Sequence, residues 1–257
     1  MIKICILASG SAGNAAFVST ERTRLLIDAG LSRREIVKRL AAIGEDAAAL
    51  DAILVTHEHS DHTCGLNALS RAAERPLPLY MTHGTAQFVD WNECAPTLER
   101  FQAGCSFSIG DFDISSFTVP HDAVDPIGYT LTTEGIKIAI ATDLGYVTQN
   151  IPDRLRDATA VLLEANHDLE MLRVGPYPWS VKQRVMSRRG HLSNDLAGKF
   201  IQAHLGYVHT LILGHISEHN NHPELVRNMG LKALNGRTLF TNLVVAQPGV
   251  QSEVFCY

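Results

Sequence analysis

The chain carries the segment Ala52-Ile53-Leu54-Val55-Thr56-His57-Glu58-His59-Ser60-Asp61-His62, in which an apolar run leads into three histidines and an aspartate. Imidazole nitrogen and carboxylate oxygen are ligand atoms for Zn, Mn and Fe. Because side chains alternate along a strand, His57 and His59 are expected on one side, while the following turn lets Asp61 and His62 point elsewhere. The pattern predicts one loop that serves two metal ions, and a merely His-rich polar loop is the alternative.

The composition is that of a globular protein that can bury a large core. Of the 257 residues, 46% are hydrophobic and 19% are charged, which favours one α/β domain over residues 1–257. No apolar run is long enough for a membrane span, and the first residues lack the pattern of a signal peptide. The formal net charge of −5 excludes a protein coated in positive charge, although not a local basic groove. The odd number of cysteines and their scatter favour reduced thiols and a cytoplasmic location; they are Cys5, Cys64, Cys94, Cys105 and Cys256.

Hydrophobic periodicity predicts an alternation of strands and helices. Strands are expected at 2–7, 15–19, 24–28, 52–56, 79–82, in two parts of 106–119 around Gly110, and at 127–133, 136–142, 161–164 and 210–214. Helices are expected at 32–43 with Ser32 as N-cap, and at 65–73, 85–92, 194–205 and 223–234. Two strand-rich halves with flanking helices predict a four-layer αβ/βα sandwich.

Three further candidate ligands follow apolar strands. His121 comes after Phe117-Thr118-Val119-Pro120, Asp143 after residues 138–142, and His215 after Leu211-Ile212-Leu213-Gly214. Strand ends are rigid supports for site residues. Each residue alone fits an ordinary hydrogen-bonded role, but together they complete two sets of ligands.

This constellation resembles the metallo-β-lactamase superfamily, and the match spans the chain. The resemblance implies one metal held by His57, His59 and His121, and a second held by Asp61, His62 and His215. Asp143 would bridge them, where the lactamases themselves have a cysteine. Two such cations lower the pKa of a shared water and stabilise the negative charge of the transition state. Glu58 and Asp28 are candidates for orienting ligands, against plain roles in solvent or in a turn.

Three segments resemble the YycJ/WalJ-like branch, which is associated with 5′–3′ exonuclease activity on DNA. They are Ser9-Gly10-Ser11-Ala12-Gly13-Asn14, His191-Leu192-Ser193-Asn194 and Leu213-Gly214-His215-Ile216-Ser217-Glu218-His219-Asn220-Asn221. In the first, Ser9, Ser11 and Asn14 are candidate phosphate contacts, unless the loop is only a tight turn.

The other two segments supply further candidates. His191 is a candidate catalytic residue that protonates the leaving oxygen, and Glu164 is a candidate for orienting it. Asn221 and His222 are candidate substrate contacts or helix caps before Pro223.

The basic stretch from Arg173 to Arg189 indicates a nucleic-acid substrate independently of any resemblance. It contains Arg184, Arg188 and Arg189 with Tyr177 and Trp179, and no acidic residue lies between Val174 and Gly190. Cations follow phosphates and aromatic rings stack on unpaired bases. The alternative is a solvated loop.

The sequence therefore predicts an enzyme, a dinuclear metal-dependent phosphodiesterase that acts as a 5′–3′ exodeoxyribonuclease on single-stranded or frayed DNA. Asp61, Asp143 and His191 are its expected catalytic residues. The expected cofactors are two ions of Zn, Mn or Fe, the expected partner is DNA, no membrane is expected, and the oligomeric state stays open. A small-molecule hydrolase for a thioester, lactone or cyclic nucleotide is the first alternative, and a non-catalytic metal-dependent DNA-binding module is the second.

Overall fold

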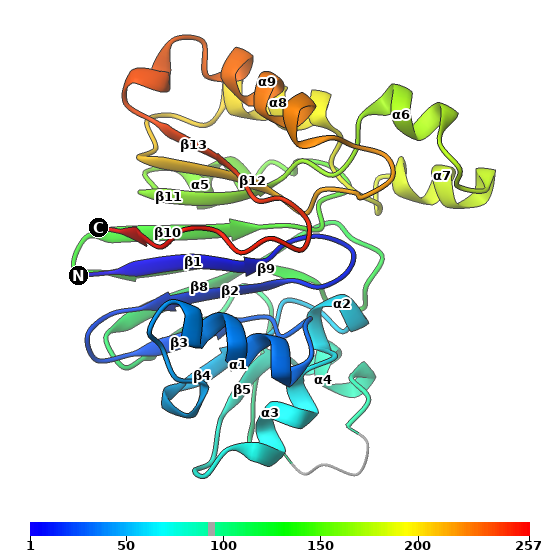
Figure 1. Ribbon diagram of the computed structural model, residues 1–257. Helices are drawn as coiled ribbons and strands as arrows, with labels where there is room; N and C mark the ends of the chain where they lie inside the picture. Colours follow the sequence, from blue (N-terminus) through cyan, green and yellow to red (C-terminus); the bar gives the residue numbers. More distant parts are fainter. Residues whose placement is uncertain (92–95) are drawn as a thin grey trace.

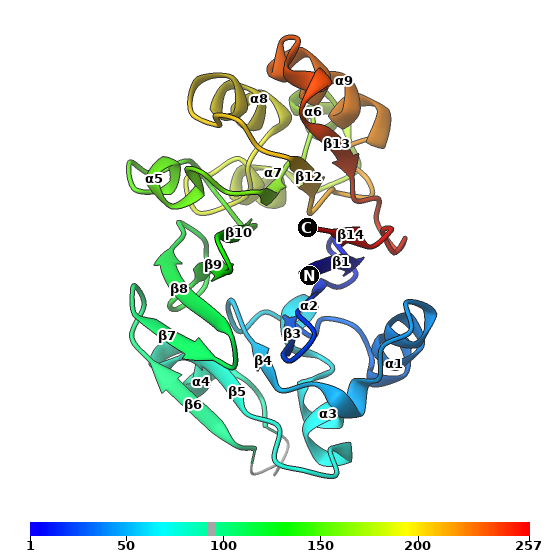
Figure 2. The ribbon, with the colours of Figure 1, turned by 90° about the vertical axis from the view of Figure 1, so that its left-hand side faces the viewer.

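The computed structural model describes residues 1–91 and 96–257. Within these ranges the strands form two seven-stranded sheets that face each other (Figures 1 and 2). The first sheet has the order β14 (Phe255–Cys256), β1 (Lys3–Ala8), β2 (Ala15–Ser19), β3 (Arg24–Ile27), β4 (Ala52–Leu54), β5 (Leu79–Thr82), β6 (Leu98–Phe101). The second has the order β13 (Asn242–Val245), β12 (Thr210–Gly214), β11 (Ala160–Glu164), β10 (Ile136–Ala141), β9 (Ile127–Thr133), β8 (Phe112–Thr118), β7 (Ser106–Ile109).

Helices cover the outer faces of both sheets (Figure 1). With the first sheet go α1 (Arg33–Ala42), α2 (Ser60–Thr63), α3 (Leu66–Ala72), α4 (His83–Phe88) and the 3-10 turn η1 (Ala47–Ala49). With the second go α5 (Ile151–Leu155), α6 (Leu169–Val174), α7 (Trp179–Val185), α8 (Asn194–Ala203), α9 (Pro223–Leu234) and the 3-10 turn η2 (Arg237–Leu239). Among the described residues, no helix is both long and apolar enough to cross a membrane.

The alternation of side chains along each strand produces the layers. In β1, Ile4 and Ile6 point into the cluster between the sheets, while Cys5 and Leu7 face the helices on the outside. A third cluster packs the outer face of the second sheet against α5, α8 and α9. The predicted four-layer αβ/βα sandwich is therefore confirmed.

Strand directions bring several strand ends to one edge of the sandwich. β3 and β4 are parallel, as are β10, β11 and β12. β1 runs with β3, and β8 with β10, because each pair is separated by one antiparallel strand. Residues that follow these strands can therefore meet at one edge.

Most predicted elements are present, with small shifts at their ends. Ser32 caps α1 by accepting a hydrogen bond from the Glu35 amide, as expected. The strand expected at 52–56 ends at Leu54, because the Thr56 amide donates to the Asp28 carboxylate at 2.8 Å and not to a neighbouring strand. The helix expected at 85–92 is α4, which ends at Phe88, and Asn92 lies outside the described residues. The strands β6, β13 and β14 and the short helices α2 and α5 to α7 were not predicted.

Candidate metal centre

The predicted ligands lie at the edge where the parallel strands end. The loop after β4 carries His57 to His62, and His121, Asp143 and His215 follow β8, β10 and β12. Asp143 and His215 have positive φ, 59° and 54°. Aspartate and histidine are among the non-glycine residues enriched in this left-handed region, and such strain clusters at functional sites.

The first group of donors consists of three imidazoles. His57 Nε2 lies 3.1 Å from His59 Nδ1, which lies 3.3 Å from His121 Nε2. His57 and His121 are buried and His59 is half-buried. Burial, followed by the charge of neighbouring histidines, lowers the pKa of His57 well below its usual value. A neutral imidazole is the form that binds a metal ion.

The second group combines a carboxylate with two imidazoles. Asp61 Oδ2 lies 3.6 Å from His62 Nε2 and 3.8 Å from His215 Nε2. Asp143 lies between the two groups: its Oδ1 is 3.6 Å from His121 Nε2, and its Oδ2 is 3.4 Å from His62 Nε2. These separations suit donors that share an ion, since each donor would lie about 2 Å from it.

Two buried atoms in this cluster show that the donor set fits a cation. Asp143 Oδ2 and His215 Nε2 have no hydrogen-bond partner among the described residues. A buried polar atom without a partner is costly and uncommon in a folded protein. A carboxylate oxygen and an imidazole nitrogen are ligand atoms that a divalent metal ion takes.

Outer hydrogen bonds fix the orientation of the imidazoles. Asp28 Oδ2 lies 2.7 Å from His62 Nδ1, and the Gly190 carbonyl oxygen lies 3.0 Å from His121 Nδ1. Glu164 Oε1 lies 2.9 Å from His215 Nδ1. A donor N–H at Nδ1 leaves the other ring nitrogen free to bind a metal.

The carboxylates control the charge of two of these histidines. Burial opposes protonation of His62, but Asp28 and Asp143 raise its pKa to about 9. Likewise, burial opposes protonation of His215, but Asp143, Asp61 and Glu164 together outweigh it and raise the pKa of His215 well above its usual value. Metal binding at these two nitrogens must therefore displace protons.

His191 lies beside the cluster and shares a carboxylate with His215. Its Nδ1 is 2.7 Å from Glu164 Oε1 and 3.7 Å from Asp143 Oδ1. Glu164 is fully buried, and its Oε2 accepts hydrogen bonds from the Leu144 and Leu192 amides. Burial alone would raise the pKa of Glu164, but the charge of His191 and the hydrogen bonds from both histidines hold it well below its usual range. Glu164 therefore orients His191, as the sequence suggested.

The glycine-rich loop reaches the cluster through two of its three candidate residues. Ser9 Oγ accepts a hydrogen bond from the His215 amide at 2.7 Å, and Asn14 Nδ2 lies 3.0 Å from His62 Nε2. Ser11 is exposed. A Cβ on Gly30 would lie 1.6 Å from the Asp61 carbonyl oxygen, so only glycine lets these loops pack so closely.

The basic stretch runs from the end of α6 through α7, and these two helices project from the body of the fold (Figure 1). Arg184 forms an ion pair with Asp122, and Arg189 donates to the His121 carbonyl oxygen. The Arg188 guanidinium lies 4.2 Å from the centre of the Tyr146 ring. All three arginines keep exposed surface, so the segment is bound to the site and still open to a ligand.

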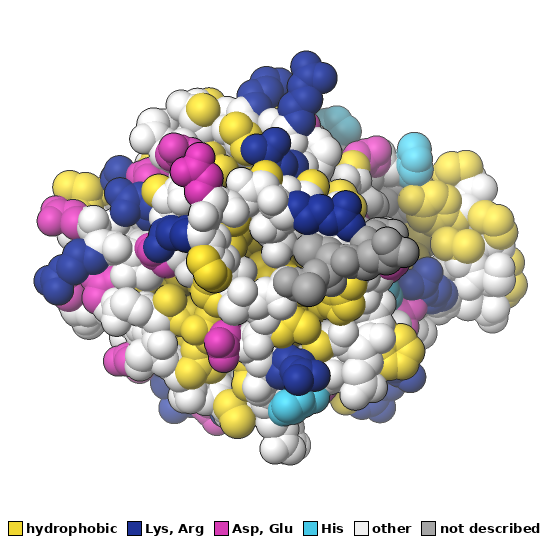
Figure 3. Space-filling model, turned by 90° about the horizontal axis from the view of Figure 1, so that it is seen from below, with side chains coloured by type: hydrophobic (Ala, Val, Ile, Leu, Met, Phe, Trp, Pro, Cys, Tyr) yellow, Lys and Arg dark blue, Asp and Glu magenta, His cyan; other side chains and the backbone are white. Residues whose placement is uncertain are grey.

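Several exposed side chains on this projection are apolar. Val174, Trp179 and Met186 are exposed there, and hydrophobic side chains gather at the right-hand edge of Figure 3. Elsewhere on the face shown in Figure 3, basic and acidic side chains are interspersed.

Two candidate substrate contacts have other partners in the structure. Asn221 is buried and exchanges hydrogen bonds of 2.9 Å with Asn194. The His222 side chain caps α9 by accepting from the Glu224 amide.

Sequence reasoning missed Asp122 near the centre, and it did not identify a partner for Glu58, which it had considered as a residue that orients ligands. Asp122, which joins His121 Nε2 to Arg184, was not singled out. Glu58 Oε1 accepts a hydrogen bond from the Val124 amide and so ties the histidine-rich loop to the segment after His121. Their position beside His121 and His57 was the only signal available for them.

Comparison with known proteins places this geometry in a family. A family model described as Beta-lactamase superfamily domain matches residues 23–216. Exodeoxyribonuclease WalJ of Streptococcus pneumoniae serotype 2 is 40% identical over 261 residues, which cover 99% of this chain and 93% of that protein. Exodeoxyribonuclease YycJ of Bacillus anthracis is 38% identical over 231 residues, which cover 86% of this chain and 85% of that protein.

A solved structure of this superfamily shares the fold. The crystal structure of the metallo-β-lactamase fold protein YhfI from Bacillus subtilis matches with a TM-score of 0.72 and 18% identity, over 98% of this chain and 100% of that one. The fold and the cluster of histidines and aspartates together indicate binding of a divalent metal. The chain belongs to the metallo-β-lactamase superfamily, in its YycJ/WalJ-like branch.

Proposed function

We propose that this protein is a metal-dependent exodeoxyribonuclease that digests single-stranded or frayed DNA from the 5′ end. The observation that carries the proposal is the convergence of two groups of three donors on the Asp143 carboxylate. Two relatives of the same branch, 40% and 38% identical, are named exodeoxyribonucleases.

The proposed site holds two divalent ions, of Zn, Mn or Fe. His57, His59 and His121 would hold one, and Asp61, His62 and His215 the other, with Asp143 shared between them. When bound, such a pair lowers the pKa of a water molecule and neutralises charge that develops on the phosphate.

The chain itself supplies a proton donor for the leaving oxygen. Glu164 accepts a hydrogen bond from His191 Nδ1, so His191 Nε2 is the nitrogen that can hold or release a proton toward substrate. The His191 side chain is 21% exposed, whereas that of Glu164 is fully buried. In the proposed mechanism His191 therefore meets the substrate, and Glu164 keeps the ring in place.

The arginines beside the centre favour a phosphodiester substrate. Arg184, Arg188 and Arg189 lie on the segment that leads into His191 and keep exposed surface. Their charge can follow the phosphates of a strand that enters the site, and the 62% exposed Trp179 can stack on an unpaired base. Ser11 lies on the exposed part of the glycine-rich loop and is the member of that loop proposed to contact a phosphate.

Two broader predictions from the sequence are also retained as proposals. Residues 1–257 are proposed to form one domain, because the cluster between the sheets joins strands from both halves of the chain. The cytoplasmic location rests on the scattered cysteines, of which Cys5, Cys64, Cys105 and Cys256 are free thiols and Cys94 lies outside the described residues.

The test uses single-stranded oligonucleotides labelled at either end, incubated with the protein and Mn²⁺, Zn²⁺ or Fe²⁺. Trimming from the 5′ end is expected for the wild type and for Asp157→Asn, and its loss is expected for Asp143→Asn. Asp157 is a matched control because it also has a left-handed backbone, with φ of 58°, and is exposed. Failure of the wild type to process either label with any of the metals would contradict the proposal, and thioester and lactone substrates would then be tested.

A further inference from the structure

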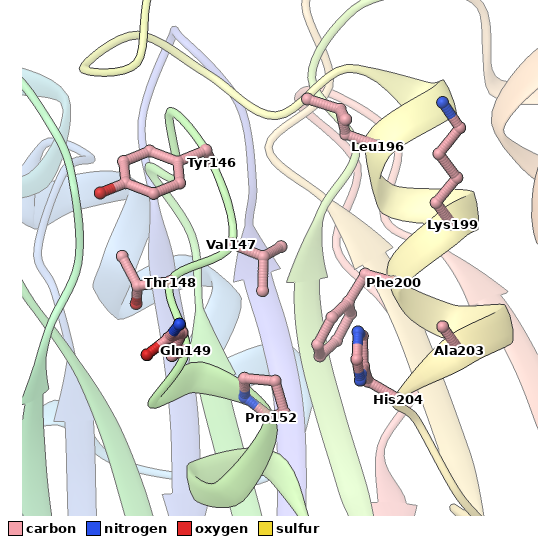
Figure 4. A pocket seen from close by; sticks show the side chains of 10 residues that line it. All are labelled: Tyr146, Val147, Thr148, Gln149, Pro152, Leu196, Lys199, Phe200, Ala203 and His204. Carbon is pink, nitrogen blue, oxygen red and sulfur yellow. The ribbon is translucent and has the colours of Figure 1, made fainter.

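A groove of about 610 Å³ lies between the segment after β10 and the helix α8 (Figure 4). Tyr146 and Leu196 are at one end of it, and Pro152 and His204 are at the other. Its volume is within the range of ordinary small-ligand sites. None of the residues assigned to the metal centre lines this groove.

The lining combines an apolar floor with a basic rim. Val147 and Phe200 contribute apolar surface, the Tyr146 ring stands at the mouth, and Lys199 is exposed on α8. Of the described residues that line the groove, none is acidic. Apolar and aromatic surface suits the faces of nucleobases, while a cation at the rim suits the phosphates that connect them.

Both walls of the groove are direct continuations of the metal centre. Tyr146 follows Asp143 by three residues, so their Cα atoms are at most about 11 Å apart. Leu196 follows His191 by five residues, and α8 begins between them. A Cβ on Gly145 would lie 2.2 Å from the Arg188 carbonyl oxygen, so the chain at the mouth of the groove packs directly against the basic stretch.

The length of the groove sets how much of a strand it can hold. Along α8 it extends from Leu196 to Ala203, which corresponds to about 12 Å at 1.5 Å per residue. Stacked bases repeat at about 3.4 Å along a strand, so roughly three fit.

We propose that this groove, the base groove, binds the nucleobases of about three nucleotides adjacent to the scissile phosphate, with Tyr146 as the first stacking surface. The inference rests on the proposed nuclease function and adds the track of the strand. It assigns Lys199 to a backbone phosphate of the same strand. Arg188, on the Tyr146 ring, supports the stacking surface from the side of the basic segment.

A tryptophan on α8 provides the first test. Ala203→Trp would fill the groove from an exposed position, and Gln202→Trp is the matched control, because Gln202 is exposed on the same helix and does not line the groove. The substrates are a long single-stranded oligonucleotide, a dinucleotide and bis(p-nitrophenyl) phosphate. Ala203→Trp should lower kcat/KM for the long strand roughly tenfold or more, since stacking of each base is worth about 1–3 kcal/mol. The two short substrates should react as with the wild type.

A second measurement reports binding without turnover. A phosphorothioate-linked oligonucleotide with 2-aminopurine near its 5′ end is titrated with the metal-loaded protein. Quenching of its fluorescence should be retained in Tyr146→Phe and lost in Tyr146→Leu.

The outcomes separate the two proposals. If the wild type cleaves DNA and Ala203→Trp matches Gln202→Trp on every substrate, the base groove is refuted and the nuclease function stands. If the wild type has no preference for the long strand over the dinucleotide, the groove is also refuted. If the wild type cleaves none of the nucleic acids, the proposed function itself fails and the inference falls with it.

Discussion

Replacement of Glu164 by glutamine tests how the outer hydrogen bonds control both metal binding and proton transfer. Glu164 Oε1 faces the Nδ1 atoms of His191 and His215, and Oε2 accepts from the amides of Leu144 and Leu192. A glutamine has one oxygen and one NH₂ group. Whichever way the side chain turns, its NH₂ group, itself a hydrogen-bond donor, faces two N–H donors. Two hydrogen bonds to a charged group are lost, and since each is worth about 1.5–3 kcal/mol, a loss of about 3–6 kcal/mol of stability is expected.

The same change affects metal binding through the ring tautomer. If the NH₂ faces the imidazoles, His215 must accept at Nδ1, which places its proton on Nε2, the proposed metal-binding nitrogen. If the oxygen faces the imidazoles, the NH₂ group faces the Leu144 and Leu192 amides, which push the side chain out of position. Metal affinity should fall roughly 10–100-fold, the usual effect of losing such an outer partner.

Asp28→Asn is the matched variant. Asp28 orients His62 and accepts from the Thr56 amide, but its described hydrogen bonds do not include His191. Both variants should bind Mn²⁺ more weakly by calorimetric titration. At saturating metal, only Glu164→Gln should still have a kcat below that of the wild type on a labelled oligonucleotide. The reduction should be roughly 10²–10⁴-fold, because His191 is then misoriented. Equal kcat values for the two variants at saturation would refute the assignment of Glu164 to proton transfer.

Three further outcomes are expected. Asp143→Asn and Asp143→Ala should both abolish turnover, but the alanine variant should be less stable in urea by about 1–2 kcal/mol, because alanine tolerates the left-handed backbone poorly; equal midpoints and slopes would contradict this. His191→Ala should lower kcat while DNA retention in a filter assay stays near that of the wild type, and an unchanged kcat would remove it from the mechanism. Burial lowers the pKa of His167 to about 4, so its neutral form stabilises the fold near neutrality and this contribution is lost as the pH falls from about 6.5 to 4. His167→Gln should therefore reduce the dependence of unfolding free energy on pH in that window by up to about 1.4 kcal/mol per unit, and identical slopes would refute it.

The predicted layers follow from strong periodic signals, and the missed elements lack such signals. The strand β6 has the sequence Leu98-Glu99-Arg100-Phe101 at a sheet edge, with no side chain fully buried, so no apolar run marks it. The strand β14 has two residues, and α5 to α7 are too short to display a helical period. Boundaries shifted where side chains replaced backbone partners, as at Thr56.

The candidate ligands could be selected from the sequence because each follows a strongly apolar strand. Partners far apart in the chain could not be selected. Asn221 and Asn194 pair across 27 positions, and Asp122 meets Arg184 across 62. Such contacts depend on how loops cross at the strand edge, which periodicity does not encode. The sequence therefore indicated which residues lie at the metal centre, but it did not indicate most of their contacts.

The left-handed residues at this edge explain why the site resists simple substitution. Asp28, Asp143 and His215 have φ between 54° and 60°, and each follows the end of a buried strand by one or two residues. A reversal of the backbone at these points aims a short polar side chain back across the sheet edge, toward the space between the two halves of the fold. The strain is tolerated because each side chain is held there by partners from other segments of the chain, as Asp28 is by Thr56 and His62. Removing the side chain therefore removes both a functional group and the contacts that stabilise the left-handed backbone. Only substitutions that keep this backbone, such as aspartate to asparagine, report on the chemistry alone.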